Sequence, residues 1–213
     1  MKYVMITWLA LLLGAVAQVR QGSWTPVVES MERGYSSISY WTYRDDGVEI
    51  GGGRISVEHG QPQWPATLED KAAFDGTTVG KLWRLGNNKW TTLDTQLTLR
   101  FGDRTVEPGI YYLVIDRPKA NDWRLVFVAP DSVSPSFIDA WAAEARPSEI
   151  PRLFSVPLRY STREKAARLD ISLALEKDDM SQGAIRVQWG PHQLETAFEI
   201  NVTSPTFYRQ SSP

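Results

Sequence analysis

The two histidines, His59 and His192, are the side chains best suited to acid–base or metal chemistry in this 213-residue sequence. The sequence contains no cysteine, which excludes thiol nucleophiles, iron–sulfur clusters and thiolate zinc sites. No His-x-His or His-x-x-x-His pair occurs, so we predict no metal site and no cofactor. His59 shares its side-chain direction with Ile55 and Val57 and should point inward. The roles of catalytic base and metal ligand remain alternatives for His59, but we favour a core residue with one hydrogen bond.

A second group of candidates surrounds two tryptophans, Trp64 and Trp90, that no buried stripe of the sequence requires. Exposed aromatic rings beside amide and charged side chains suit sugars, because the C–H face of a pyranose ring matches a negative π surface. The planar guanidinium of Arg84 suits either a ligand or a buried structural ion pair, and we favour the structural role. The predicted ligand-binding face consists of His59, Trp64, Arg84, Asn88, Lys89 and Trp90.

We predict no catalytic residue, because none of the common catalytic or phosphate-binding motifs occurs. The sequence therefore favours a non-catalytic binding or structural protein of the cell envelope, with a glycan, a small molecule or an envelope protein as its partner. A glycoside hydrolase that uses two of the 25 acidic residues stays open as the alternative. The formal charge of −2 and the lack of a basic cluster argue against nucleic acid.

Alternation of apolar and polar residues, which is typical of half-buried strands, dominates the sequence after residue 36. The turns between the alternating stretches contain Gly, Asn and Asp, which favours antiparallel connections. We predict an all-β fold: an antiparallel β-sandwich or jelly roll of about ten strands with one short amphipathic helix. The strands are expected at residues 37–43, 54–59, 81–85, 93–101, 110–116, 122–128, 153–160, 169–175, 185–189 and 194–202.

The helix is expected after Ser134, which can cap its N-terminus. Its apolar stripe, which should be buried, consists of Phe137, Ile138, Trp141, Ala142 and Ala145. In contrast, the segment from Gly60 to Gly80 lacks alternation. We expect it to be a long irregular loop, a kind of segment that is often functional.

The N-terminus has the features of a secretory signal peptide. Lys2 is followed by about 13 mostly apolar residues, too few to cross a bilayer, and by the small-x-small sequence Ala15-Val16-Ala17. We expect cleavage before Gln18, no membrane span in the mature protein, and a periplasmic or secreted location. The predicted organisation is a signal peptide at 1–17, a leader at 18–35, a single β-sandwich domain at 36–203 and a loose tail at 204–213.

Three segments carry a resemblance to a known family: residues 80–93 (GKLWRLGNNKWTTL), residues 107–113 (EPGIYYL) and residues 122–127 (DWRLVF). Together with His59-Gly60-Gln61-Pro62 and Trp189, they resemble the exported bacterial family known as domain of unknown function 2911. The resemblance extends over residues 54–201. It implies an exported antiparallel β domain and brings no activity with it.

The sequence departs from the family's pattern at two places. The family's Ala-Asn-Glu-Ala run is replaced by Asn87-Asn88-Lys89-Trp90, which reverses one charge and replaces a small residue with an indole ring. The family's Tyr-Gly-Arg-Pro becomes His59-Gly60-Gln61-Pro62. A site that depends on the family's acidic residue therefore cannot work unchanged in this chain.

Overall fold

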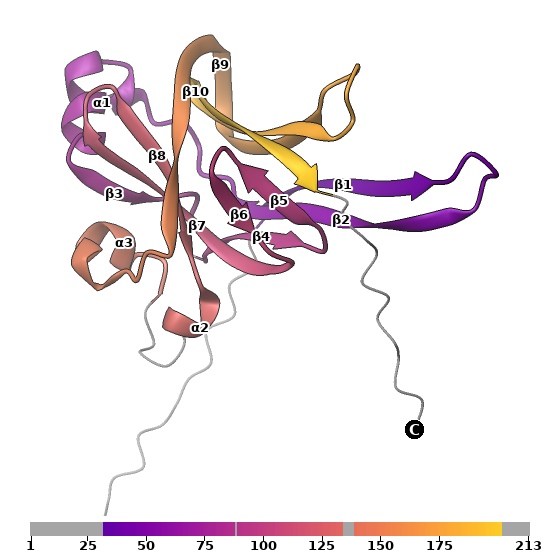
Figure 1. The fold of residues 1–213 in the computed structure, drawn as a ribbon. Helices are drawn as coiled ribbons and strands as arrows, with labels where there is room; N and C mark the ends of the chain where they lie inside the picture. Colours follow the sequence, from indigo (N-terminus) through magenta and orange to yellow (C-terminus); the bar gives the residue numbers. More distant parts are fainter. Residues whose placement is uncertain (1–31, 88, 134–138, 202–213) are drawn as a thin grey trace, which may run out of the picture. The chain divides into compact units, whose positions relative to one another are not determined.

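The computed structural model describes residues 32–87, 89–133 and 139–201, and most of these are β-strand (Figure 1). All pairings between the described strands are antiparallel, which confirms the predicted fold class. The strands are β1 (Arg33–Tyr43), β2 (Glu49–Gly60), β3 (Lys81–Arg84), β4 (Thr91–Thr95), β5 (Thr98–Phe101), β6 (Arg104–Val106), β7 (Gly109–Lys119), β8 (Asp122–Val128), β9 (Phe154–Leu175) and β10 (Gln182–Asn201). The short helices are η1 (Ala66–Leu68), α1 (Lys71–Thr78), α2 (Pro130–Val133), α3 (Ala142–Ala145) and η3 (Pro147–Glu149).

The strands form one continuous sheet in the order β1-β2-β4-β7-β8-β9-β10-β5-β6, with β3 beside β7. Strand β9 joins the two layers, because residues 154–158 pair with β8 and residues 159–175 pair with β10. Inward side chains of both layers share one core, as expected for a sandwich. We call the layer of β1, β2, β3, β4, β7 and β8 the first layer, and the layer of β5, β6, β10 and residues 159–175 of β9 the second layer. The core includes Ile55, Val57, Leu93, Leu113, Leu125 and Phe127 from the first layer and Leu99, Phe101, Leu169, Ile171, Ile185 and Phe198 from the second.

A second, smaller apolar cluster lies on the opposite face of the first layer. It contains Leu82 of β3 and Val126 of β8 together with two alanines of α3, Ala142 and Ala143. The expectation that Trp141 is buried in the helical stripe is wrong, because its side chain is 48% exposed. The one-turn helix α3 turns only its alanine side toward the sheet, and residues 134–138 of the expected helix lie outside the described residues.

The strand boundaries differ from the expected ones where the chain changes layer without breaking its alternation. The expected strand 93–101 is two strands, β4 and β5, joined by a corner at Gln96, whose backbone N–H donates to the Arg54 carbonyl. Conversely, the expected pairs of strands at 153–160 and 169–175, and at 185–189 and 194–202, are the continuous strands β9 and β10. Gly190, with a φ of 57°, lies at a register shift within β10 instead of in a turn.

The segment from Gly60 to Gly80 is not an irregular loop, so this expectation is also wrong. It contains η1 and α1, and the Asp70 side chain caps α1 by accepting a hydrogen bond from the Ala73 N–H. Only Phe74 and Thr78 of α1 are buried, so its apolar stripe is one turn long. A stripe of two residues gives too weak a periodic signal to be recognised in the sequence.

Residues 1–31 and 202–213 lie outside the described residues, and with them the predicted signal peptide and tail. The first strand begins at Arg33, within the segment that we expected to be a leader. Among the described residues, no helix is long and apolar enough to cross a membrane.

Candidate functional site

Lys89 and Trp90, two of the predicted binding residues, line an open groove of about 390 Å³ on the outer face of the first layer, away from the main core. We call it the outer groove. Its lining residues are Arg33, Glu58, Lys89, Trp90, Thr92, Tyr112, Asp139 and Ala140. The groove thus contains aromatic, basic and acidic side chains side by side.

Strand register positions the floor of the outer groove. Glu58 of β2 is paired with Thr92 of β4, which is paired with Tyr112 of β7, so the three side chains form one row across the sheet. Their neighbours along the strands, such as Val57 and Leu93, are fully buried. Because side chains alternate between faces, the row points away from the core.

The aromatic part of the groove is held in place by its neighbours. The indole of Trp90 stacks on the Tyr112 ring with 4.9 Å between the ring centroids and 4° between the planes. Arg33 donates from Nη2 to the Trp90 carbonyl oxygen at 2.9 Å and forms an ion pair with Glu58. The groove therefore offers a fixed aromatic pair next to charged hydrogen-bonding groups.

His59 does not line the outer groove but lies beneath the surface, where it is 1% exposed. Its Nε2 accepts a hydrogen bond from the Ile171 N–H of β9 at 3.1 Å. The imidazole thus gives this buried backbone donor of the second layer a partner. Gly34, its partner on β1, must be glycine because an added Cβ would clash with the imidazole ring. The favoured interpretation of His59 as a core residue with one hydrogen bond is confirmed. Its Nδ1 is buried and has no hydrogen-bond partner among the described residues.

The pKa of His59 is lowered, first because burial penalises the charged imidazolium. The nearby Arg33 guanidinium lowers the pKa further, whereas the charges of Asp170 and Glu58 oppose the shift. A neutral ring is also what the geometry requires, since Nε2 acts as an acceptor.

Trp64 is buried at 8% exposure, so the expectation of an exposed ring is wrong. Its ring lies against Gly190, contacts Trp189 edge-on at 5.1 Å, and donates from Nε1 to the Glu69 carboxylate at 3.0 Å. No local pattern predicts this burial, because Trp189 and Gly190, which cover the ring, lie on β10, more than 120 residues away along the chain.

Arg84 ends β3 and forms an ion pair with Glu144 of α3, with 3.1 Å between Nε and Oε1. It thus links the sheet to the helix and does not line the outer groove. Asn88 lies outside the described residues. Of the six predicted binding residues, the structure therefore brings Lys89 and Trp90 together and places His59, Trp64 and Arg84 elsewhere.

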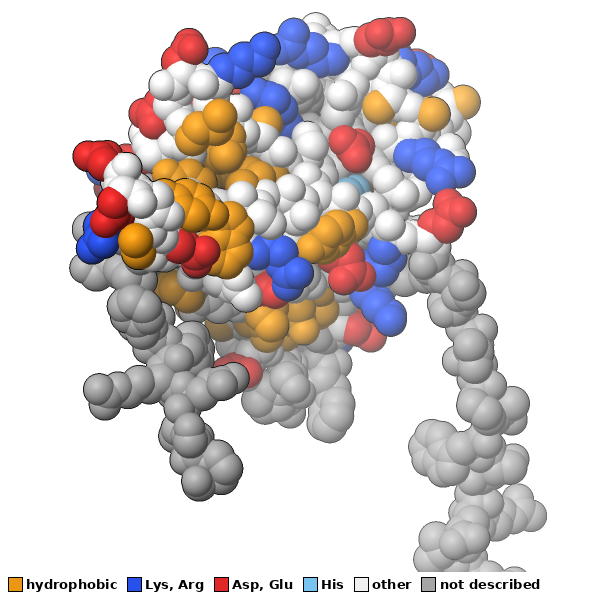
Figure 2. All heavy atoms as spheres, turned by 90° about the vertical axis from the view of Figure 1, so that its right-hand side faces the viewer, with side chains coloured by type: hydrophobic (Ala, Val, Ile, Leu, Met, Phe, Trp, Pro, Cys, Tyr) orange, Lys and Arg blue, Asp and Glu red, His pale blue; other side chains and the backbone are white. Residues whose placement is uncertain are grey.

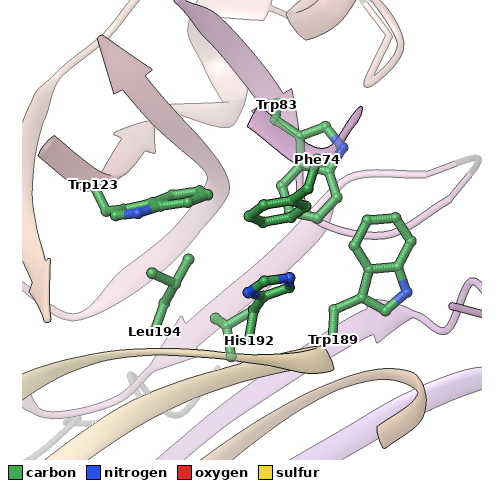
Figure 3. A pocket seen from close by; sticks show the side chains of 7 residues that line it. Phe74, Trp83, Trp123, Trp189, His192 and Leu194 are labelled. Atoms are coloured by element: carbon green, nitrogen blue, oxygen red, sulfur yellow. The ribbon is translucent and has the colours of Figure 1, made fainter. Parts of the chain in front are cut away.

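A second, smaller pocket lies between the layers and is almost entirely aromatic, as Figure 3 shows. It has room for about one water molecule, with a volume of about 20 Å³. Trp83 and Trp189 stack at 4.9 Å, and the His192 ring stacks on Phe74 at 3.8 Å. The lining residues are Phe74, Trp83, Trp123, Val187, Trp189, His192 and Leu194. The arrangement packs the end of the sandwich, and in this form the pocket is too small for a sugar.

Arg117, which sequence reasoning missed, fastens α1 to this aromatic pocket. It is 5% exposed, forms an ion pair with Asp75 at 2.8 Å, and donates to the Thr78 hydroxyl and to the Ala120 carbonyl. Its guanidinium lies 4.2 Å from the centroid of the Trp123 ring. No local pattern distinguishes Arg117 from a surface arginine, because its partners come from separate elements.

Several carboxyl groups among the described residues have a lowered pKa, chiefly because a neighbouring side chain donates a hydrogen bond to the carboxylate. The donor is Arg or Lys in all but one case, and the groups are Asp46, Glu69, Asp75, Asp122, Asp179 and Glu195. These six groups therefore stay ionised near neutral pH.

The described part of the chain also contains no cluster of three or more His, Asp or Glu side chains that could hold a metal ion.

Comparison with known proteins agrees with the family resemblance. Residues 44–198 match the model of a family described as protein of unknown function DUF2911. The chain has no significant match among curated proteins or among solved structures. Because the match covers most of the sequence, the chain belongs to the DUF2911 family.

Proposed function

We propose that this chain is a non-catalytic, exported binding protein that holds a polyhydroxylated, sugar-like ligand in the outer groove. The observation that carries the proposal is the fixed Trp90–Tyr112 pair with Arg33, Glu58 and Lys89 around it. The positively polarised C–H groups of a sugar ring are attracted to the negative face of an indole. The hydroxyl groups of the same ring are both donors and acceptors, and they match the carboxylate, guanidinium and ammonium groups beside the indole.

The residues of the groove favour binding over hydrolysis. A glycoside hydrolase needs one carboxylic acid that stays protonated near neutral pH, together with a second carboxylate at a defined separation. Glu58, one of the two carboxylates in the groove, is instead engaged in an ion pair with Arg33. The hydrolase alternative predicts that reducing ends appear when the protein is incubated with a polysaccharide that it binds.

The proposed location outside the cytoplasm rests on the N-terminal sequence: Lys2, the apolar run and Ala15-Val16-Ala17. Expression in a bacterial host, followed by N-terminal sequencing of the exported protein, tests it. A protein that begins at Gln18 in the exported fraction supports the proposal, whereas an uncleaved protein in the cytoplasm contradicts it.

Binding is tested with a glycan array and then by calorimetry on the sugar that binds most strongly. We expect Trp90→Ala to weaken binding about tenfold or more, because the stacking surface is lost. Trp90→Phe should keep part of the affinity, since it retains a smaller aromatic face. Met180→Ala changes an exposed apolar residue in the β9–β10 turn, outside the groove, and serves as the control.

Circular dichroism and a thermal melt check that each variant is folded. Absence of binding to every sugar on the array, or equal affinity in folded Trp90→Ala and wild type, would refute the proposed function. A protein or small-molecule partner would then have to be sought for the groove.

A further inference from the structure

Strand β1 presents a row of exposed aromatic rings on the outer face of the sheet. From Tyr35 to Tyr43, residues with the parity of Tyr35 are exposed and those with the parity of Ser36 are half-buried. Three of the exposed residues are aromatic: Tyr35, Trp41 and Tyr43, at 58%, 52% and 59% exposure. Monomeric proteins seldom expose several large rings on one strand without a function for them.

This row is continuous with the outer groove. Tyr35 is the cross-strand partner of Glu58, which lines the groove and is in register with Thr92 and Tyr112. Trp41 is six residues further along β1, which corresponds to about 20 Å at about 3.3 Å per residue. A row of aromatic rings separated by polar residues therefore runs from Tyr112 across the sheet to Tyr35 and then along β1 to Trp41.

Trp41 is positioned as a flat platform. Its cross-strand partner is Gly52, and an added Cβ at Gly52 would clash with the indole ring and with the backbone of β1. The indole therefore lies close to the glycine, and about half of its surface is open to solvent. Figure 1 shows that this end of β1 and β2 extends beyond the neighbouring strands, so no other described strand covers it.

The residues between the rings are polar, which decides between possible occupants. On the same face lie three exposed residues, Ser37, Ser39 and Arg54, together with Ser56, which is buried. Figure 2, which looks onto the side from which β1 and β2 extend, shows hydrophobic patches separated by charged and other polar side chains. Aromatic rings spaced by hydroxyl and charged groups suit a chain of hydroxylated rings. A permanent protein interface would have a continuous apolar centre.

We propose that the outer face of β1 is the second half of an extended glycan site, so that the ligand is a linear polysaccharide that runs from the outer groove along Tyr35 toward Trp41 and Tyr43. This proposal rests on the proposed function, because it assigns to the same site a chain of sugar rings instead of a single sugar. Each ring that stacks on a further aromatic side chain adds affinity, so affinity should rise with chain length until the chain reaches Trp41.

The test measures affinity against chain length. The probes are β-1,4-linked glucose oligomers and β-1,4-linked N-acetylglucosamine oligomers, from monosaccharide to hexasaccharide, and also the sugar selected on the array. We expect the affinity of the wild type to rise about tenfold or more from the shortest to the longest oligomer. Trp41→Ala should abolish this rise and leave the affinity for the shortest oligomer unchanged, whereas Trp90→Ala should weaken binding at every length. Val48→Ala, an exposed residue in the same hairpin, is the matched control and should behave like the wild type.

The possible failures are distinguishable. If short oligomers bind and depend on Trp90, but Trp41→Ala changes nothing at any length, the extended site is wrong and the proposed function stands. If no sugar binds, the proposed function itself is wrong.

Sedimentation velocity gives a separate check, because β1 is a sheet edge that a second copy could pair with. A dimer that dissociates in Trp41→Ala, without any effect on sugar binding, would overturn the glycan assignment in favour of self-association.

Discussion

Acidification between pH 8 and pH 5.5 should destabilise this protein through His59. The imidazole is buried, its pKa is below the ordinary value of 6.5, and Nε2 accepts from the Ile171 N–H. In the unfolded chain the ring takes up a proton as the pH falls through 6.5, whereas in the folded chain it resists doing so. The unfolded state therefore binds more protons, and stability is lost as the pH falls below 6.5.

The magnitude follows from the linkage relation. If the folded ring stays neutral down to pH 5.5, one unit below the unfolded pKa, His59 contributes a loss of up to about 1.4 kcal/mol. His192 adds a loss of the same sign, because burial and the Arg117 guanidinium also lower its pKa. Protonation of the carboxyl groups with lowered pKa values also destabilises the protein, but only below about pH 4.5, outside this window.

The assay is urea unfolding followed by tryptophan fluorescence at pH 8, 6.5 and 5.5, for the wild type and for His59→Gln. Glutamine can still accept a hydrogen bond from the Ile171 N–H but does not titrate, so the variant should lose the part of the pH dependence that comes from His59. The remaining dependence should disappear in the double variant with His192→Gln. A His59→Gln protein with the full acid sensitivity of the wild type would refute the assignment of the effect to His59.

Three further changes test the packing of the fold, each by urea unfolding. Arg117→Met should cost about 3 kcal/mol, because it removes the buried guanidinium that binds Asp75, the Thr78 hydroxyl and the Ala120 carbonyl together, whereas Arg84→Ala, which removes a partly exposed pair, should cost about 1 kcal/mol or less; equal losses would contradict the structural role of Arg117. Gly190→Ala should cost about 2 kcal/mol or more, since the new methyl group meets a buried indole at positive φ, whereas Gly47→Ala, with open space around it, should cost only about 1 kcal/mol of backbone strain. Asp70→Ala should cost about 1 kcal/mol through loss of the α1 cap, and no loss would mean that the cap contributes nothing to stability.

The sequence predicted most of the strands because each of them carries its own signal, but it missed the three-residue strand β6 and did not predict where the chain turns. The alternation of Leu93, Leu97 and Phe101 is unbroken across the corner at Gln96, since all three side chains face the same core from both layers. Conversely, Gly190 has the residue type of a turn but lies inside a long bent strand. Alternation reports which face is buried and is insensitive to the change of layer.

The residues of the outer groove were predicted only in part for the same kind of reason. Lys89 and Trp90 stood out because they depart from the family's pattern, and both line the outer groove. Arg33, which holds the Trp90 carbonyl, is 57 residues away along the chain and lies in a segment that shows no clear pattern. Such contacts between distant residues are decided by sheet order, and sheet order is not encoded in any local pattern.

Residues that fit the family's pattern and residues that depart from it lie in different parts of this protein. Trp83, Trp123 and Trp189, which fit the family's pattern, meet in the small aromatic pocket between the layers, where they pack the end of the sandwich. Lys89 and Trp90, which depart from that pattern, lie in the outer groove together with Arg33, outside the matched residues 44–198. Changing a surface groove leaves the core intact, so the groove can differ among family members while the fold is kept. A relative with Glu and Ala at these two positions should therefore share the fold and the aromatic pocket, but should lack the indole platform on which the proposed ligand stacks.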